Sequence, residues 1–388
     1  MVETKNLSCL WFENDNSLEC QQNGSTVFKD TQEHWKDGFC RLLKLSNEEA
    51  KQWIEGVALT SPQIFNKSFS KLNKNDKVLV LKKSIESFPK FVVSTSSPVS
   101  NAELLSSIGV CGHKSNTIWE SGIGKDNDFV VVGCKECEYG WLINANNPKT
   151  SLNDTTLYNE TYFEGKEKDV GYGSYLSQKD WRIEKSHRLT RQIQGICSYL
   201  NINLLDKKVL DIGSSYGFTR KAFDEAGFKH DGIELSKYAA EICEKEFGFK
   251  TFVGTANDFE KVSNDKYTIV TMFDILEHVS NPLALLGSVK NFLNPDGICV
   301  IRTPNLMAIE REIFGRFYHS LKYEHLHYFS PKVLISLLEA SGLQTLFLAS
   351  ESHLLKGFFE GDLNYFSRLL KGSDLFLVAC NKSVVLKA

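Results

Sequence analysis

The sequence predicts an α/β protein whose C-terminal half folds into a doubly wound, largely parallel β-sheet. From Lys207 onward, short apolar runs alternate with amphipathic helical segments, which is the pattern of strand–helix–strand units. The apolar runs are nearly continuous, as in strands that are covered on both faces. The first run leads into a glycine-containing turn, and ligands of such sheets bind where the strands end.

The expected elements follow each other at regular intervals. Strands are predicted at 207–213, 230–235, 250–254, 267–273, 298–303, 343–349 and 374–380. Helices are predicted at about 177–200, 220–227 and 237–248, and two more begin at Pro282 and Pro331, after the capping residues Asn281 and Ser330. Gly342 is expected to end the last helix. The helix from Pro282 is expected to bury one face. That face consists of Leu283, Leu286, Val289 and Leu293.

Composition and charge restrict the class of protein. The chain has 388 residues, of which 42% are hydrophobic and 24% charged, and its net charge is −3. This length predicts two or three units. We expect an α+β unit at 1–105, a small cysteine-containing segment at 106–150, and the doubly wound domain at 170–388. The near-neutral charge does not favour nucleic acid as a partner. No apolar run reaches the ~20 residues of a membrane span, so we expect a cytoplasmic protein without a membrane partner. The oligomeric state cannot be derived from the sequence.

The most specific motif is Val209–Gly217, VLDIGSSYG, followed about twenty residues later by Glu234 at the end of the second strand. Glycines in such a turn permit positive φ angles and close approach of a ligand, and the acid can accept hydrogen bonds from ribose hydroxyls. A dinucleotide site would require G-x-G-x-x-G. The observed D-x-G-x-S-x-G instead resembles motif I of class I S-adenosylmethionine-dependent methyltransferases, D-x-G-x-G-x-G, with Ser215 in place of the middle glycine.

The resemblance extends over residues 170–350. The segments LEHV, NPLALLGSVKNFLNPDG, TPN and YEHLHYFSP follow the order seen in the family that includes the ubiquinone-type O-methyltransferases. This resemblance implies a Rossmann-like class I fold and S-adenosyl-L-methionine as cofactor. The residues that it implies for cofactor binding are Asp211, Gly213, Ser215, Gly217, Glu234, Leu235, Ala256, Asn257, Phe273 and Asp274.

Methyl transfer to a hydroxyl group requires a base or a metal ion, because the free hydroxyl has a high pKa. Two groups of residues can supply the base or bind the metal ion. Asp274, Glu277 and His278 resemble the E-x-x-E-H metal site of ubiquinone-type and small-RNA methyltransferases. The second group is Tyr323–His327, where the chain resembles deoxysugar C-methyltransferases. That resemblance places Glu324 and His325 near the reacting centre. The residues predicted to act in catalysis are His278, Tyr323, Glu324 and His325.

The cysteine-containing segment resembles an N-terminal zinc ribbon found in a related group of methyltransferases. Cys134 and Cys137 form one C-x-x-C pair, and Cys111 and His113 stand where the other pair is expected. The first pair departs from the family pattern because Lys114 replaces its second cysteine. A zinc ribbon and a metal-free version of it therefore both remain open.

The acceptor predicted from these resemblances is a small molecule, methylated on oxygen: a sugar, a sugar nucleotide or a natural-product intermediate. Methylation of a nucleotide sugar on carbon is the alternative reaction. A binding module that keeps the fold without transfer is the non-enzymatic alternative, and RNA methylation is the least favoured because of the net charge.

Overall fold

A computed structural model describes residues 116–123, 129–144, 157–166, 173–199, 202, 204, 208–308, 311, 318, 320–351 and 372–381. The elements expected within 1–105 lie outside these residues. The chain divides into two compact units. One, the sheet unit, consists of Ser97–Leu306, Lys322–Ala349 and Asp374–Ala388, and the site described below lies within it. The other consists of Met1–Ser96, Met307–Leu321 and Ser350–Ser373.

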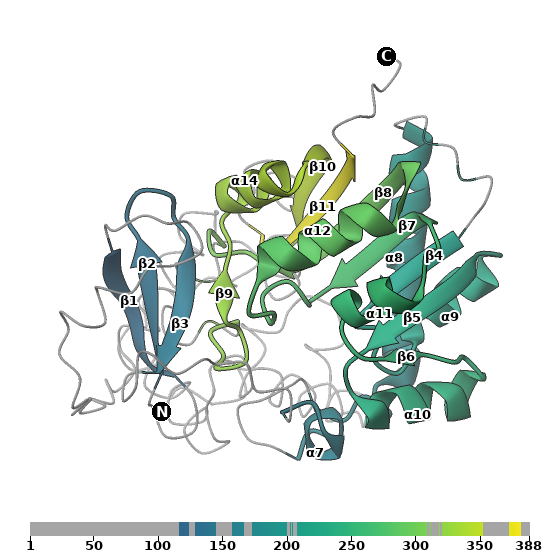
Figure 1. Ribbon diagram of the computed structural model, residues 1–388. Helices are drawn as coiled ribbons and strands as arrows, with labels where there is room; N and C mark the ends of the chain where they lie inside the picture. The colour runs from purple at the N-terminus through teal and green to yellow at the C-terminus, as the bar shows by residue number, and fades with distance from the viewer. Residues whose placement is uncertain are drawn as a thin grey trace, which may run out of the picture. The chain divides into compact units, whose positions relative to one another are not determined.

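The sheet unit contains a seven-stranded sheet in the order β10-β11-β8-β7-β4-β5-β6 (Figure 1). Its strands are β4 (Lys208–Ile212), β5 (Lys229–Glu234), β6 (Phe252–Val253), β7 (Tyr267–Phe273), β8 (Leu293–Pro304), β10 (Leu343–Glu351) and β11 (Asp374–Asn381). The pairs β4–β5, β5–β6, β4–β7 and β7–β8 are parallel, and β11 runs antiparallel to β8. Numbered within this sheet alone, the strand order is 6-7-5-4-1-2-3. The order reverses beside β4, so the loop after β4 lies at the position where doubly wound sheets bind ligands.

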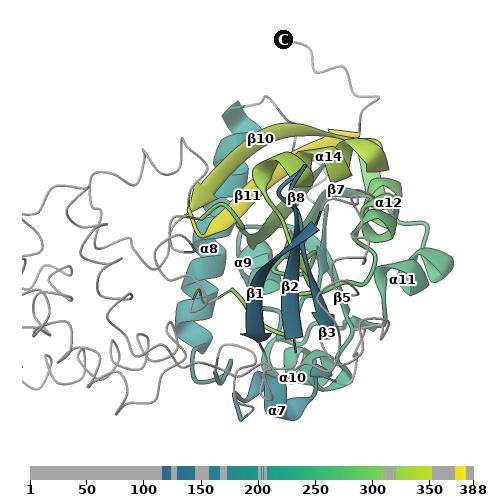
Figure 2. The same cartoon turned by 90° about the vertical axis from the view of Figure 1, so that its left-hand side faces the viewer.

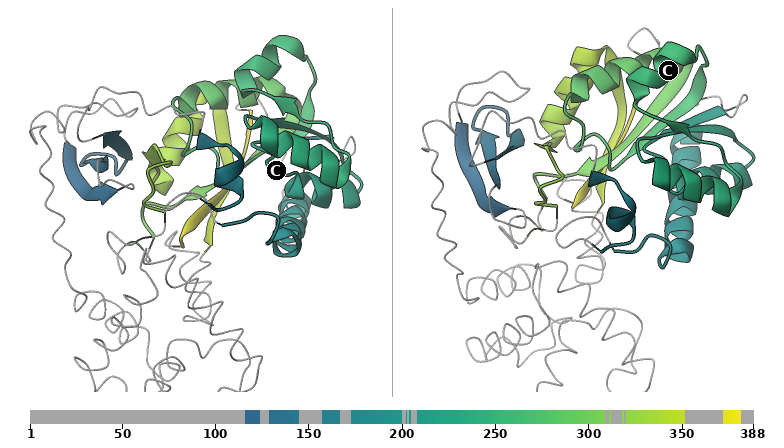
Figure 3. Two further views of the ribbon diagram at one scale, coloured as in Figure 1. Left: turned by 90° about the horizontal axis from the view of Figure 1, so that it is seen from below. Right: turned by 60° about the horizontal axis from the view of Figure 1, so that its bottom comes forward.

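Helices cover both faces of this sheet (Figures 1 and 3). They are α8 (Lys179–Tyr199), α9 (Phe218–Glu225), α10 (Lys237–Phe247), α11 (Ala256–Val262), α12 (Pro282–Phe292) and α14 (Pro331–Ser341). Neighbouring residues of a strand point to opposite faces. Accordingly, Val209 packs in a cluster with α8 and α9, whereas Leu210 packs in a cluster with α11, α12 and α14. The predicted doubly wound fold is thereby confirmed.

The helix caps agree with the sequence. The side chain of Asn281 accepts a hydrogen bond from the Ala284 N–H (3.0 Å), and Ser330 caps α14. Gly342 ends α14 in the left-handed region, with φ 84°.

α12 and β8 each differ from the prediction in one detail. Leu283 is 42% exposed, because the buried face of α12 runs through Leu286, Val289 and Phe292 instead. β8 also begins at Leu293, before the predicted start at 298, and it contains a bulge between the pairs Tyr267–Leu293 and Ile269–Ile298.

A second sheet has the order β1-β2-β3-β9 (Figure 1), and Figure 2 shows β1, β2 and β3 side by side. It consists of β1 (Asn116–Ile123), β2 (Phe129–Cys134), β3 (Gly140–Asn144) and β9 (His327–Tyr328), and all its pairings are antiparallel. Gly133 and Gly140 are required here because a Cβ atom at either would meet the Trp119 ring. The strand β9 joins the cysteine-containing segment to a loop between β8 and α14, so the two parts of the sheet unit share a sheet.

A short helix, α7 (Glu160–Phe163), precedes α8 and begins at the capping residue Asn159. Among the described helices, none has the length and apolar character that crossing a bilayer requires.

Candidate active site

The loop after β4 turns through three residues with positive φ: Gly213 (74°), Ser215 (49°) and Gly217 (80°). The N–H groups of Gly213 and Ser214 donate to the Ile233 carbonyl at 2.8 and 3.0 Å, which ties the loop to β5. The left-handed conformation costs a residue other than glycine roughly 1–2 kcal/mol. The chain accepts this cost at Ser215, where motif I has a glycine, so the serine keeps the glycine's backbone geometry.

Glu234 ends β5 beside this loop and is 7% exposed. Its carboxylate accepts the N–H of Ser215 (2.7 Å) and that of Ser236 (2.8 Å). Burial raises the pKa of Glu234, and these hydrogen bonds oppose that change. The predicted loop and the predicted acid are therefore in direct contact, and the carboxylate keeps lone pairs for further donors.

Asp211 is buried under the same loop and is 3% exposed. Thr271 donates its hydroxyl to Oδ1 of Asp211 at 2.6 Å. Burial raises the pKa of this carboxyl to about 6, against the hydrogen bond from Thr271 and the charge of Arg220, which lower it. A buried carboxylate at this point provides negative charge for a cationic ligand.

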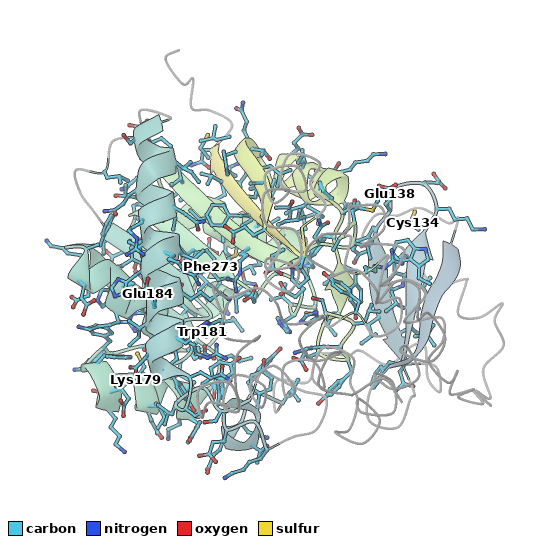
Figure 4. The ribbon with its side chains drawn as sticks, turned by 180° about the vertical axis from the view of Figure 1, so that it is seen from behind. Cys134, Glu138, Lys179, Trp181, Glu184 and Phe273 are labelled. Carbon is cyan, nitrogen blue, oxygen red and sulfur yellow. The ribbon has the colours of Figure 1, made fainter. Side chains whose placement is uncertain are left out.

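The other predicted cofactor positions lie at neighbouring strand ends. Leu235 follows β5 directly. Ala256 is buried as the first residue of α11, and the Asn257 side chain accepts a hydrogen bond from Ser288 (2.6 Å). Phe273 ends β7 and packs in the cluster that contains α8, beside which it appears in Figure 4.

Aromatic side chains surround Tyr216 of the cofactor loop. Its ring stacks on Phe163 at 5.3 Å and meets Tyr175 edge-on at 5.9 Å. The Arg182 guanidinium lies over the Tyr175 ring, 3.5 Å from the centroid of that ring. Tyr175 is thus packed against the loop after β4.

Asp274 has a left-handed backbone, with φ 58°. Its carboxylate accepts hydrogen bonds from Nε (3.0 Å) and from a terminal nitrogen of Arg302, which lies at the end of the neighbouring strand β8. This pairing lowers the pKa of Asp274 in spite of burial, which raises it. The sequence had grouped Asp274 with Glu277 and His278 as a possible metal set, but the structure engages its carboxylate with Arg302.

Glu277, His278 and His325 instead form a group, which we call the Glu277 cluster. One possible ligand atom from each residue lies within 4.8 Å of the others. Oε2 of Glu277 accepts a hydrogen bond from Thr303 (2.9 Å), whereas its buried Oε1 has no hydrogen-bond partner among the described residues. Burial, followed by the charge of Asp274, raises the pKa of Glu277 well above its usual range. Glu277 and His278 lie in the loop after β7, at the carboxyl edge of the sheet, and His325 comes from the segment between β8 and α14.

The His278 ring is fixed in one tautomer. Its Nδ1 lies 2.8 Å from the Glu324 carbonyl, which can only accept, so Nδ1 carries the proton and Nε2 carries a lone pair. Nε2 lies 3.9 Å from Oε1 of Glu277. Burial lowers the pKa of His278, against the neighbouring Glu324 charge. A neutral imidazole with a free lone pair suits both a general base and a metal ligand.

The segment Tyr323–His325 contributes unequally. His325 is fully buried and its ring meets that of His278 edge-on at 4.7 Å. The buried Glu324 carboxylate lies 3.6 Å from the Lys322 ammonium, and the Tyr323 ring stacks on Phe129 at 5.8 Å. The structure therefore brings together the two predicted histidines and uses the backbone of Glu324 to orient one of them.

The sequence did not single out Thr303, Arg302 or Tyr158 as site residues. Tyr158 meets the His278 ring edge-on at 6.1 Å, and its pKa is raised by burial and then by the charges of Glu324 and Glu277. About 120 residues separate these two rings along the chain, so periodicity could not connect them.

Both ring nitrogens of His327 have hydrogen-bond partners. Its Nε2 donates to the Val279 carbonyl (2.9 Å), and its Nδ1 accepts from the Tyr139 hydroxyl. Burial lowers its pKa to about 4, so the ring is neutral at physiological pH.

Cys134 ends β2, at the side of the second sheet where Glu138 also lies (Figure 4), and Cys137 belongs to the tight turn that leads to β3. The Glu136 N–H points at the Cys134 sulfur, 3.4 Å away, and Glu138 has a left-handed backbone with φ 60°. Both cysteines are buried. Cys111 and His113 lie outside the described residues, so the second half of the predicted zinc site is untested.

Comparison with known proteins agrees with this fold. The family model of a methyltransferase domain matches residues 185–347. The ubiquinone biosynthesis O-methyltransferase of Actinobacillus pleuropneumoniae serotype 5b is 32% identical over 126 residues, which make up 30% of this chain and 54% of that protein. The Haemophilus ducreyi protein of the same name is 25% identical over 201 residues, 48% of this chain and 80% of that protein.

This chain thus spans about half the length of the Actinobacillus protein. Among solved structures, an S-adenosylmethionine-dependent methyltransferase from Archaeoglobus fulgidus aligns with 53% of this chain and 98% of its own, at 19% identity and a TM-score of 0.40. The strand order, the loop after β4 and the family match show that this chain carries a class I S-adenosylmethionine-dependent methyltransferase domain.

Proposed function

We propose that this protein transfers a methyl group from S-adenosylmethionine to a hydroxyl oxygen of a small molecule, such as a sugar, a sugar nucleotide or a natural-product intermediate. The observation that carries the proposal is the Glu277 cluster at the carboxyl edge of the sheet. The cofactor supplies an activated methyl group, so the protein has to orient the acceptor and remove its proton. The O-methyltransferase names of the relatives support transfer to oxygen.

In this proposal, Asp211, Glu234 and the loop 213–217 bind the cofactor. Glu234 accepts hydrogen bonds from the ribose hydroxyls of the cofactor. The negative charge of the buried Asp211 carboxylate favours the positively charged sulfonium of S-adenosylmethionine. His278 takes the proton of the acceptor hydroxyl on Nε2, because its Nδ1 is occupied by the Glu324 carbonyl.

The Glu277 cluster also fits a divalent metal ion. The unpartnered Oε1 of Glu277 and the lone pair on Nε2 of His278 are ligands of the required type. The Glu324 carbonyl holds the second nitrogen of His278, as is usual for a metal-bound histidine. A bound metal ion would acidify the acceptor hydroxyl.

The test is incubation of the purified chain with S-adenosylmethionine and a panel of catechols, sugars and sugar nucleotides, with and without chelator and added Mg²⁺. We expect one acceptor to gain an O-methyl group, identified by mass spectrometry and NMR. A new C-methyl group would favour the alternative reaction. Cofactor binding without transfer to any acceptor would indicate a binding module.

We further propose that Cys134 and Cys137 provide half of a structural zinc site. A backbone N–H directed at the Cys134 sulfur stabilises a thiolate, which is the form that binds zinc. Metal analysis of the purified chain should find one zinc per molecule, lost in Cys134→Ser and retained in Cys197→Ser, a buried cysteine of α8. Absence of zinc from the unaltered protein would support the metal-free version.

A further inference from the structure

The loop that carries Glu277 and His278 is held by the segment 324–327. The N–H groups of Leu326 and His327 both donate to the Glu277 carbonyl, at 2.8 and 3.1 Å. The His327 ring donates to the Val279 carbonyl, and His278 donates to the Glu324 carbonyl. Four hydrogen bonds therefore join the segment 324–327 to the loop 277–279, which we call the catalytic loop and which lies almost fifty residues earlier in the chain. They fix the backbone of the catalytic loop and the ring of His278.

This segment is in turn an edge of the second sheet. His327 pairs with Trp141, Tyr328 pairs with Gly140, and the Leu142 N–H donates to the Leu326 carbonyl at 3.0 Å. The segment thus lies between two structures, the cysteine-containing sheet on one side and the catalytic loop on the other.

Tyr139 is the side chain that links them. Tyr139 is fully buried and follows the turn that contains Cys134 and Cys137. The Cys134 N–H donates a 2.7 Å hydrogen bond to the Tyr139 carbonyl, which closes this turn. Its hydroxyl donates to Nδ1 of His327, and its ring stacks on His327 and Trp141 at 5.9 and 5.5 Å. Since the same imidazole donates from Nε2 to Val279, one neutral tautomer satisfies both contacts.

We infer that Tyr139 and His327 are positioning residues, which hold Glu277 and His278 in place by linking the cysteine turn to the catalytic loop. This inference rests on the proposed function of the Glu277 cluster. It makes the sheet β1–β3 a part of the catalytic unit, because small displacements of an acid–base group reduce the rate strongly.

The test is Tyr139→Phe, which removes the hydroxyl and keeps the ring. We expect kcat to fall about 10-fold, with KM for S-adenosylmethionine and the affinity for S-adenosylhomocysteine unchanged. The matched control is Tyr267→Phe, a fully buried tyrosine at the amino end of β7 whose hydroxyl donates to Asp231 at 2.9 Å. This control should lose a comparable amount of stability and keep its kcat.

A double-mutant cycle shows whether Tyr139 acts through His327. We expect Tyr139→Phe to lower kcat no further once His327→Leu is present, because coupled residues are not additive. Independent, additive losses in the double variant, or an unchanged kcat in Tyr139→Phe, would overturn the inference.

A readout without turnover separates this inference from the proposed function. In Tyr139→Phe, the amide protons of Leu326 and His327 should exchange with deuterium faster than in the unaltered protein, because their acceptor at Glu277 is held less firmly. Unchanged exchange at both amides would contradict the inference even if no acceptor had been found. Faster exchange in a chain that methylates nothing would contradict the proposed function alone.

Discussion

Replacing His278 with glutamine is expected to lower kcat about 100-fold or more, while S-adenosylhomocysteine binds as before. General acid–base groups contribute roughly 10²–10⁴-fold to enzymatic rates. Glutamine retains a donor for the Glu324 carbonyl but has no basic nitrogen to replace Nε2. The measurement is steady-state kinetics with the acceptor found in the screen, together with calorimetric titration of S-adenosylhomocysteine.

His187→Gln is a suitable control for this variant. His187 lies on α8, where it contacts Glu225 of α9 at 2.9 Å, away from the Glu277 cluster. It should keep its full rate. A His278→Gln variant with the rate of the unaltered protein would show that the imidazole has no part in proton transfer or metal binding.

The Asp211→Asn variant should be more stable than the unaltered protein at neutral pH and should bind S-adenosylmethionine less tightly. Burial raises the pKa of Asp211 from 3.8 to about 6, so the folded state holds its proton to a higher pH than the unfolded state. Ionisation therefore costs the folded state stability as pH rises from about 4 to 6, up to about 3 kcal/mol at pH 7. Asparagine keeps an acceptor for the Thr271 hydroxyl and avoids this cost.

Urea unfolding of both proteins between pH 4 and 8 measures the effect. The gain in unfolding free energy should be absent at pH 4 and near its maximum at pH 7. Affinity should fall more for S-adenosylmethionine than for S-adenosylhomocysteine, because only the former is a sulfonium cation. Equal stability of the two proteins at every pH would show that Asp211 is not destabilised by burial.

Local signals in the sequence were sufficient to predict most strands of the doubly wound sheet. The strand at Tyr267–Phe273 and the caps at Asn281 and Ser330 agree with the structure, because each depends on a few neighbouring residues. The helix α11 was not predicted, although Thr255 and Asp258 form its capping box directly after the predicted strand 250–254.

The candidate site was only partly predictable. His278 and His325 were each identified from their motifs, but their ring contact depends on the loop 324–327 folding back onto the end of β7. The engagement of Asp274 by Arg302 depends in turn on the pairing of Phe273 with Arg302 across β7 and β8. Neither a long-range contact nor a strand register can be derived from local patterns.

The central claim is that the loop after β4 and Glu234 bind the nucleoside that S-adenosylmethionine and S-adenosylhomocysteine share, and calorimetric titration with S-adenosylhomocysteine and with NAD⁺ tests it most directly. We predict saturable binding of S-adenosylhomocysteine at one site, at least about 10-fold weaker in Glu234→Ala (about 1.4 kcal/mol), and no binding of NAD⁺. Uptake of NAD⁺ instead, or an affinity for S-adenosylhomocysteine that does not depend on Glu234, would contradict the claim.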